Sequence, residues 1–497
     1  MTDIRHRLLK GTFWLAGARL VSNSLAFIGT LIVARVLLPA DFGLVALGTT
    51  MLAVLSAVTD IPLSEALVRH KDPSPDHFHT AWTMSFIRAA AIAAVFAAAS
   101  WPAAVFYHDG RLSGIMVALS AGVVLTGVEN PRTIMLTKDL VFWQQFMLQV
   151  ARQLVSVVVT IIVALAYHSY WALIVGSLSG QAVGVAVSYT VLPFRPRLRL
   201  QHTRELMSFS VWLTFCQVVN TLNWKFDQLL VGIFLGKAQL GYYTVGDKLA
   251  IIPTREATTP LITTLFPAFS KVIGDRSRLA AAYQSAQALV TAVALPAGVA
   301  VALLADPLVR VTMGDKWAPA VLVVQVLASV FAMQTLGTLA QPLAMAAGET
   351  RMLFRRDLQA FAVRIPFIII GMYFGGLAGI LYARAVFGTA GILLNTNIVS
   401  RITGLTLLQQ IRANVRSVIA TAAMAGVMMA VRTMLSPGST WGHIHELLFL
   451  ATSGIGAYLV VTTTLWRAMG SPNGPETEVV SILFRTSTLG RQRLLLS

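Results

Sequence analysis

Seven polar residues within one apolar segment are the first candidates for chemistry in this chain. The segment, FCQVVNTLNWKFDQLLVG at residues 215–232, has the length and flanks of a membrane-spanning helix. A charge that faced lipid would cost at least a few kcal/mol, so these side chains must face protein or water. Lysine and amide groups there can bind anions and hydroxyl groups. The seven are Gln217, Asn220, Thr221, Asn223, Lys225, Asp227 and Gln228.

A helical projection places most of these residues on one side. At about 100° per residue, all except Asn223 fall on an arc of roughly 160°. In the following segment, 242–260, Thr244, Lys248, Arg255 and Thr259 fall within roughly 60° of one another. Glu256 lies at the edge of that group. The pattern predicts a polar surface with an excess of positive charge, which suits phosphates, acidic sugars and hydroxyl-rich ligands.

An internal repeat relates the two halves of the chain. LIVARVLLPADFGLVALG begins at Leu31, and LLVGIFLGKAQLGYYTVG begins at Leu229, 198 residues later. Without a gap, Gly43 matches Gly241. The alternative is chance similarity between apolar segments. A true repeat predicts two pseudo-symmetric lobes around a central cavity, because such parallel repeats are typical of transporters.

The same offset extends the predicted ligand-binding surface to the first helix, where Arg19 and Asn23 align with Gln217 and Thr221. The full set of predicted substrate-binding residues is Arg19, Asn23, Gln217, Asn220, Thr221, Lys225, Gln228, Lys248 and Arg255.

Other ionisable residues fall within the predicted spans. Four acidic residues are candidates for proton or sodium coupling: Asp60, Glu129, Asp227 and Glu256. The alternative for such residues is structural pairing, because a buried charge needs a partner. We favour that interpretation for Arg152, Arg364 and Arg384 and leave it open for the acidic residues and Arg88.

Composition sets the class of protein. Hydrophobic residues make up 56% of the 497 residues and charged residues only 12%, against about 25% in soluble proteins. The sequence therefore predicts an all-α, polytopic membrane protein. We expect about fourteen helices, near 11–37, 43–68, 80–106, 112–131, 146–167, 170–192, 206–235, 240–268, 283–304, 318–347, 358–374, 376–400, 413–434 and 444–466.

The charge of the connections alternates along the chain. One set is rich in arginine, as in the linker LPFRPRLRLQHTRE at 192–205, and the other set is poor. By the positive-inside rule both termini are expected in the cytoplasm. The net charge of +17 then reflects topology, and no nucleic-acid partner is expected. The predicted parts are an N-lobe at 1–192, a linker at 193–205, a C-lobe at 206–400, an extra helix pair at 401–466 and a tail at 467–497.

Motifs for other chemistry are weak. HFH at 77–79 and HIHE at 443–446 lack a second ligand pair, so we interpret them as loop residues and expect no metal. No phosphate-binding loop of the GxxxxGK[ST] type occurs, and we expect no cofactor. GMYFGGLAG at 371–379 is expected to form a loop with close-packed ends. The single cysteine, Cys216, excludes an internal disulfide.

Several stretches resemble bacterial polysaccharide-transport flippases of the Wzx type, particularly the branch of colanic-acid and succinoglycan exporters. These are LLKGTFWLAGARLVSNSLAFIGTLIVARVLLPADFGLVAL at the start, then FDQLLVGIFLGKAQLGYYTVGDKLAIIPT, LFPAFSKVIGDRSRLAAAY and LADPLVRVTMGDKWAPAVLVVQVLA. The resemblance covers about residues 8–410. It implies the fold of the multidrug/oligosaccharidyl-lipid/polysaccharide exporter superfamily, with two six-helix lobes and two extra helices.

The resemblance also implies a function, which is transfer of undecaprenyl-pyrophosphate-linked oligosaccharide across the bacterial inner membrane by alternating access, without catalysis. A polymerase and a chain-length regulator are the implied partners, and a monomer is favoured. A multidrug exporter or a peptidoglycan-precursor flippase of the same superfamily is the alternative, and a membrane glycosyltransferase is less favoured because acidic or nucleophilic motifs are lacking.

Overall fold

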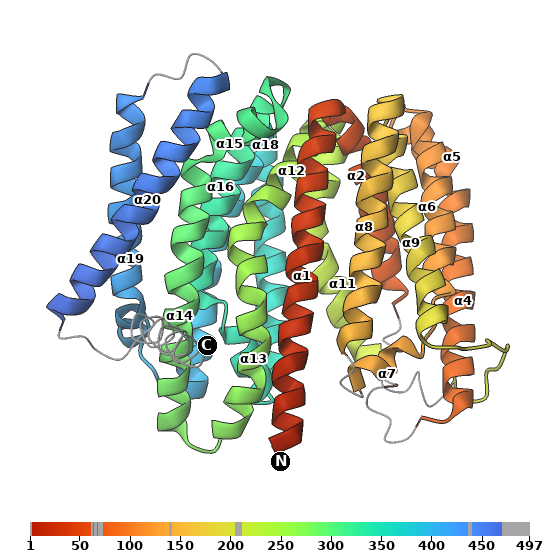
Figure 1. Ribbon diagram of the computed structural model, residues 1–497, viewed down its shortest axis with the longest axis horizontal. Coiled ribbons are helices and arrows are strands. Elements are labelled where there is room, and N and C mark those ends of the chain that lie inside the picture. Colours follow the sequence, from red (N-terminus) through yellow and green to blue (C-terminus); the bar gives the residue numbers. More distant parts are fainter. Residues whose placement is uncertain are drawn as a thin grey trace, which may run out of the picture. The chain divides into compact units, whose positions relative to one another are not determined.

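The computed structural model describes residues 2–60, 63, 67, 73–138, 142–203, 211–435 and 440–469. Within these ranges every regular element is a helix (Figure 1). The chain divides into two compact units, Met1–Val245 and Gly246–Ser497. The division falls inside one helix. The two lobes predicted on either side of residues 193–205 were defined from the sequence repeat, and they stay a prediction.

The first unit is built from long helices that pack in pairs. Helix α1 packs on α8, α8 on α9, α4 on α6, and α2 on α11. The ring of Trp14 contacts that of Trp143 in α8, with centroids 4.8 Å apart. The elements are α1 (Thr2–Val36), α2 (Pro39–Val58), α4 (Pro75–Ala98), α5 (Ser100–Phe106), α6 (Arg111–Gly127), α7 (Thr133–Lys138), α8 (Phe142–Tyr167), α9 (Trp171–Val191), α11 (Val211–Leu230), the π-helical η1 (Val231–Leu235) and the start of α12 (Lys237–Ile251).

The second unit is organised around α14, which contacts both α16 and α19. Phe269, Tyr283 and Trp317 are fully buried in it. Its elements after α12 are η2 (Ile252–Glu256), α13 (Ala257–Val272), α14 (Arg276–Leu303), α15 (Ala305–Met313), η3 (Asp315–Trp317), α16 (Ala318–Gln334), η4 (Thr335–Gly337), α17 (Ala340–Ala346), α18 (Thr350–Thr403), α19 (Leu407–Met434) and α20 (Thr440–Ala468).

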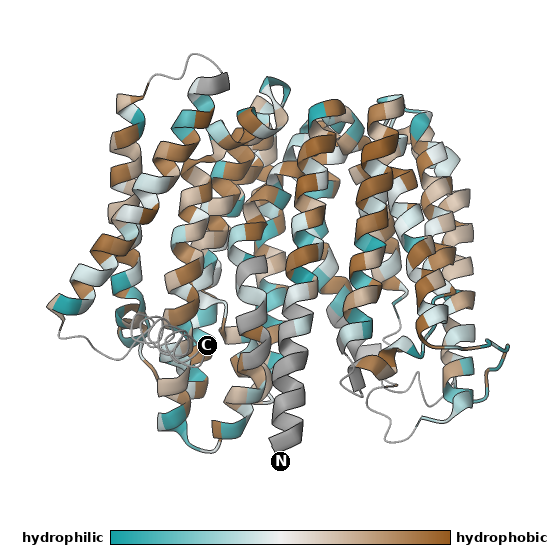
Figure 2. Cartoon of the chain, viewed as in Figure 1, coloured by the Kyte–Doolittle hydropathy of each residue, from teal (hydrophilic) through white to brown (hydrophobic). Residues whose placement is uncertain are grey.

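The helices have the length and hydropathy of membrane spans. Ten helical segments among the described residues are long and apolar enough to cross a bilayer, and α6 is a shorter apolar helix. Figure 2 shows hydrophobic residues over much of the length of helices such as α8 and α16. The polar α11 and the α12–η2–α13 segment complete a set that is consistent with fourteen spans. The protein is therefore an all-α, multi-pass membrane protein, as predicted.

Helix α18 accounts for two of the expected spans. At 1.5 Å per residue its 54 residues would extend roughly 80 Å, far more than a bilayer core of about 30 Å. The backbone reverses at Gly376, whose φ of 54° favours glycine. A Cβ atom on Gly379 would lie 1.8 Å from the carbonyl oxygen of Gly371, so the two arms touch. The close-packed ends predicted for 371–379 are confirmed, but the predicted loop is only a kink at Gly376 between two helical arms.

Two of the predicted helices show local features that proline explains. The predicted helix 43–68 begins earlier, at Pro39, because proline suits the first turn and Asp41 accepts a hydrogen bond from the Leu38 amide at 3.1 Å. In the predicted helix 240–268, Pro253 does not break the chain of helical turns. It lies in η2, a π-helical turn that accommodates the missing amide hydrogen.

The second helix of each repeat begins at a matching position. Helix α2 begins at Pro39 and α12 at Lys237, which are 198 residues apart, the offset of the sequence repeat. The two helices cross at the matched glycines. A Cβ atom on Gly43 would lie 1.7 Å from the Lys237 carbonyl oxygen, and one on Gly241 would lie 1.9 Å from that of Pro39. This reciprocity is what a twofold relation between the repeats requires.

A methyl group at this crossing should be poorly tolerated. We expect Gly43→Ala to lower the free energy of unfolding by at least about 1–3 kcal/mol, because the helices must move apart. Thermal melting of the purified protein measures this effect. Gly426→Ala in α19 is the matched control: no atom lies within 4 Å of its added Cβ, so its melting temperature should stay equal or rise. Equal melting of Gly43→Ala and wild type would contradict the close crossing.

Candidate functional site

The predicted polar arc of α11 grades from exposed to buried along the helix. Gln217 and Asn220 are exposed, Thr221 and Lys225 are half-buried, and Asp227 and Gln228 are buried. The buried end of the arc, at Asp227 and Gln228, contacts α12 and α2 through hydrogen bonds. The exposed end, at Gln217 and Asn220, remains accessible. The arc therefore contains two kinds of polar residue, some held by protein and others open to a ligand.

A small hydrogen-bond network joins the two repeats at Gln228. Its Oε1 accepts hydrogen bonds from the Lys225 ammonium at 3.1 Å and from the Thr50 hydroxyl of α2 at 3.0 Å. Thr50 occupies the position in the first repeat that Lys248 occupies in the second. Sequence reasoning placed Lys225 and Gln228 on one face, and the structure brings them together, but Thr50 was not among the predicted site residues.

Asp227 is fully buried between α11 and α12. The hydroxyl of Tyr243 donates a hydrogen bond to its Oδ2 at 2.9 Å. A carboxylate without exposure needs such donors, because desolvation disfavours its charged form. The contact joins the two helices of the second repeat near the crossing of α2 and α12. Asp227 is thus placed to hold this hairpin, and its predicted role in ion coupling stays a prediction.

The other predicted site residues lie on α1, α12 and η2. Arg19 is exposed and Asn23 is half-buried on α1, whereas Lys248 and Arg255 are exposed in the second unit. The side chain of Glu256 lies outside the described residues, as do residues 470–497 of the predicted tail. The central cavity predicted between the lobes stays a prediction.

Ion pairs hold several of the ionisable residues that fall within the predicted spans. Arg152 contacts Glu129 at 2.7 Å, and Asp60 pairs with Arg88. The nearly buried Arg384 pairs with Asp247 at 3.4 Å, and its guanidinium lies 5.2 Å from the centre of the Phe331 ring. Structural pairing, as predicted for Arg152 and Arg384, is confirmed. Arg364 is half-buried.

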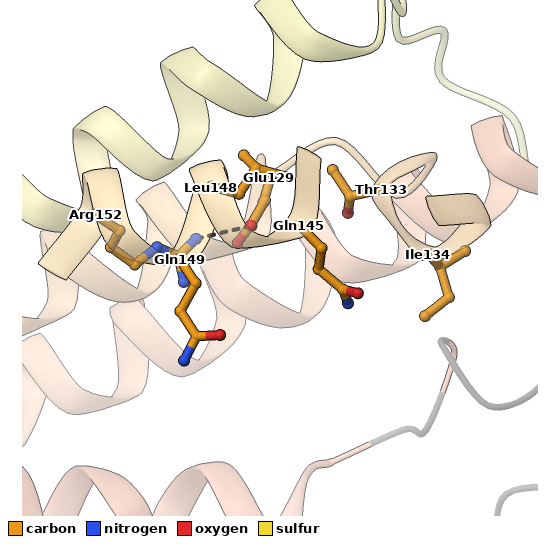
Figure 3. Close-up of a pocket in the computed structure, with 7 residues that line it drawn as sticks. All are labelled: Glu129, Thr133, Ile134, Gln145, Leu148, Gln149 and Arg152. Carbon is orange, nitrogen blue, oxygen red and sulfur yellow. Dashed lines mark hydrogen bonds and ion pairs between the residues drawn. The ribbon is translucent and has the colours of Figure 1, made fainter. Parts of the chain in front are cut away.

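A polar pocket surrounds the Glu129–Arg152 pair (Figure 3). It has a volume of about 230 Å³, and Gln145, Gln149 and Arg152 project into it from one side of α8. Sequence reasoning named Glu129 and Arg152 but missed the two glutamines. The sequence did contain a signal for them: Gln145, Gln149 and Arg152 are four and three residues apart, which places them on one face of a helix. The lining residues are Glu129, Thr133, Ile134, Gln145, Leu148, Gln149 and Arg152.

An apolar cavity of about 570 Å³ lies in the second unit, next to the second arm of α18. Aliphatic side chains from η4, α18 and α19 dominate its lining, among them Leu336, Leu393 and Val418. Such a lining offers few hydrogen bonds and suits a hydrocarbon chain.

Both histidine motifs lie in helices, which corrects the expectation of loop residues. His77 is in the first turn of α4, where Ser74 and Pro75 start the helix, and it stacks on His202. The HIHE motif lies in α20. There His443 and Glu446 lie close to Asp306, a grouping that could hold a metal. Arg432 contacts Glu446 at 3.4 Å and Asp306 at 3.7 Å, so a cationic side chain already neutralises these carboxylates.

A second charge cluster lies at the start of α12. The carboxylate of Asp109, in the connection between α5 and α6, accepts hydrogen bonds from Arg111 at 3.0 Å and from Lys237. These bonds, the one from Arg111 foremost, hold the pKa of Asp109 well below its usual range against the opposing effect of burial. The cluster ties the second repeat to the first unit beside the glycine crossing.

Asp109 should make stability dependent on pH. Its folded pKa lies below the unfolded value of about 3.9, so its contribution is complete above that pH and is lost as pH falls below it. We expect Asp109→Asn to cost about 1–3 kcal/mol at pH 7 and progressively less below pH 4. Melting temperatures of both proteins between pH 7 and pH 3 test this. Asp315→Asn, which removes an exposed partner of Arg310, should have little effect.

Comparison with known proteins places this geometry in a family. The chain is 23% identical over 387 residues to the lipopolysaccharide biosynthesis protein WzxC of Escherichia coli, covering 76% of this chain and 78% of the relative. It is 22% identical over 307 residues to the succinoglycan biosynthesis transport protein ExoT of Rhizobium meliloti, covering 61% and 62% of the two chains.

The fold is similar to that of a solved lipid II flippase, MurJ, in an inward closed conformation. The TM-score is 0.73 at 13% identity, over 93% of this chain and 99% of the other. Residues 32–322 match the family described as "Polysaccharide biosynthesis protein". Since this match covers more than half of the sequence, the chain belongs to the polysaccharide biosynthesis protein family, and its fold is that of the multidrug/oligosaccharidyl-lipid/polysaccharide exporter superfamily.

Proposed function

We propose that this protein moves undecaprenyl-pyrophosphate-linked oligosaccharide units from the inner to the outer leaflet of a bacterial inner membrane. The products serve the synthesis of an exopolysaccharide or lipopolysaccharide. The family and the names of the relatives, which are polysaccharide biosynthesis and transport proteins, support this class of cargo. The proposed process is translocation by alternating access, with no covalent step.

The observation that carries the proposal is the pair of polar helices that open the two repeats. Helices α1 and α11 carry polar residues at equivalent positions, and the helices that follow them cross at Gly43 and Gly241. A polar head group needs a hydrophilic route through the hydrocarbon core, because a charge in lipid is costly. We assign that route to the accessible parts of these helices.

The cationic residues give the route its selectivity. Lys225 is half-buried, and Lys248 and Arg255 are exposed. We propose that these three contact the pyrophosphate or acidic sugars of the head group, because charge-assisted hydrogen bonds to phosphate are strong. Arg19, Asn23, Gln217, Asn220 and Thr221 would then contact sugar hydroxyl groups.

The lipid tail needs a different environment. A polyprenyl chain gains nothing from polar contacts and can stay in lipid or in an apolar groove. The cavity of about 570 Å³ beside α18 and α19 has a suitable lining. We propose it as a place where a segment of the hydrocarbon tail rests while the head group crosses.

Orientation and partners complete the proposal. By the positive-inside rule, the arginine-rich connections favour an orientation with both termini in the cytoplasm. A polymerase and a chain-length regulator would act on the exported unit. Coupling to protons or sodium is assigned to the acidic residues Asp60, Glu129, Asp227 or Glu256.

Loss of a cationic contact should reduce export. We expect Lys225→Ala, Lys248→Ala and Arg255→Ala each to lower polymer export about tenfold or more, because one hydrogen bond to a charged group contributes about 1.5–3 kcal/mol. Surface polymer is measured in a deletion strain that carries each variant, at matched protein levels in the membrane. Lys271→Ala, at the exposed end of α13, is the control. Normal export by all three variants would refute the assignment.

A further inference from the structure

We infer that the polar pocket at the first turns of α8 binds one neutral sugar ring of the cargo through its hydroxyl groups. We call it the α8 pocket, with the seven lining residues given above. This inference rests on the proposed function and adds a second recognition site, distinct from the cationic residues. Four features of the pocket support it: its rigidity, its charge balance, its size and its position.

The turn that carries Glu129 is held rigidly from both sides. The carbonyl of Val128 accepts hydrogen bonds from the Tyr189 hydroxyl at 2.8 Å and from the Trp82 indole at 3.3 Å. The buried amide of Asn130 donates to the carbonyl oxygens of Ser188 and Leu192, at 3.1 and 2.7 Å. A ligand-binding group on such a turn keeps its position without a ligand, which is how binding sites are preorganised.

Arg152 is held on the opposite wall by a glycine. Gly184 of α9 leaves room for the guanidinium, since a Cβ atom there would lie 2.3 Å from the arginine Nε. The side chain is thereby directed towards Glu129, which it contacts at 2.7 Å. The two charged groups are each about one-third exposed, at 39% for Arg152 and 31% for Glu129, so both can accept a further contact.

The charge of the pocket selects against anions. One carboxylate and one guanidinium cancel. The remaining polar groups are the amide of Gln149, the amide of Gln145, whose Oε1 is buried, and the hydroxyl of Thr133, which donates to the Asn130 carbonyl at 2.9 Å and can still accept. These groups supply donors and acceptors in a small space, which matches the two-way hydrogen bonding of a sugar hydroxyl. Leu148 and Ile134 offer apolar surface for the carbon face of a ring.

Size and position agree with one ring. At about 230 Å³ the pocket is smaller than the roughly 300–1,000 Å³ typical of sites for drug-sized ligands, so it admits one ring and not a whole oligosaccharide. The connection between α6 and α8 carries Arg132 and Lys138, which place this end of the unit on the cytoplasmic side by the positive-inside rule. In the proposed function, the cargo is loaded from that side.

The test is direct binding by the purified full-length protein. The probe is the oligosaccharide released by mild acid from the lipid-linked repeat unit of the host strain, which lacks pyrophosphate. Saturation-transfer NMR titration gives its Kd. We expect Gln149→Leu and Gln145→Leu each to weaken binding about tenfold, because each removes hydrogen bonds and leaves sugar hydroxyls unpaired.

Gln153→Leu is the matched control. Gln153 follows Arg152 on the same helix and is absent from the pocket lining. It should bind the oligosaccharide as the wild type does. Gly184→Ala, which displaces Arg152 without removing any polar group, should weaken binding as the glutamine variants do. Melting temperatures confirm that every variant is folded.

Inorganic pyrophosphate is the second probe and separates the possible outcomes. We expect its binding to be unchanged in the two glutamine variants and weakened by Lys225→Ala. Unchanged oligosaccharide binding in folded Gln145→Leu and Gln149→Leu protein would overturn the sugar site, even where polymer export shows that the proposed function holds. Weaker pyrophosphate binding in these variants would make the pocket an anion site and would overturn the inference too.

Discussion

The need to give every charge in the membrane a partner or water determines how the polar residues of this protein are arranged. Arg384 meets this need with Asp247 and an aromatic ring, Arg152 with Glu129, and Asp227 with the Tyr243 hydroxyl. The contacts of Arg384 and Asp227 each fix the register of two helices, because loss of either partner would leave a costly buried group. In our proposal, the polar side chains that remain accessible, such as Gln217 and Asn220 of α11, contact the cargo.

Backbone contact between the repeats is the second constraint. Gly43 and Gly241 let α2 and α12 touch without intervening side chains, and the Asp109–Lys237 pair lies at the first residue of α12. The glycine contact depends on close packing of the two backbones, and the Asp109–Lys237 contact depends on opposite charges. Both join the start of α12 to earlier parts of the chain, the glycine contact to α2 and the ion pair to the connection between α5 and α6.

Two chemically different surfaces therefore serve one lipid-linked cargo in our proposals. The lysine and arginine residues of α11, α12 and η2 suit the pyrophosphate or acidic groups, and the charge-balanced α8 pocket suits a neutral ring. The apolar cavity beside α18 and α19 suits hydrocarbon. Such a division would allow a transporter to recognise a common carrier and to discriminate among sugars, because the contacts that serve each are on different residues.

Much of the fold followed from local pattern. Each of the fourteen apolar segments overlaps a helix among the described residues, because about twenty apolar residues leave few other options in a membrane. The repeat offset also predicted the matching starts of α2 and α12, and the glycines of 371–379 predicted the reversal of α18. The histidine motifs were misjudged as loops, because short polar clusters at a helix start resemble a turn.

By itself, the sequence determined the membrane class, the repeat and the polar arcs, since all three depend on residue spacing along one helix. Only the tertiary structure decided which members of an arc are buried: Asp227 lies under Tyr243, whereas Asn220 is exposed on the same helix. It also decided that Gln145 and Gln149 share a pocket with Glu129. These relations depend on which helices pack together, and the contacts that choose helix partners join residues far apart in the chain.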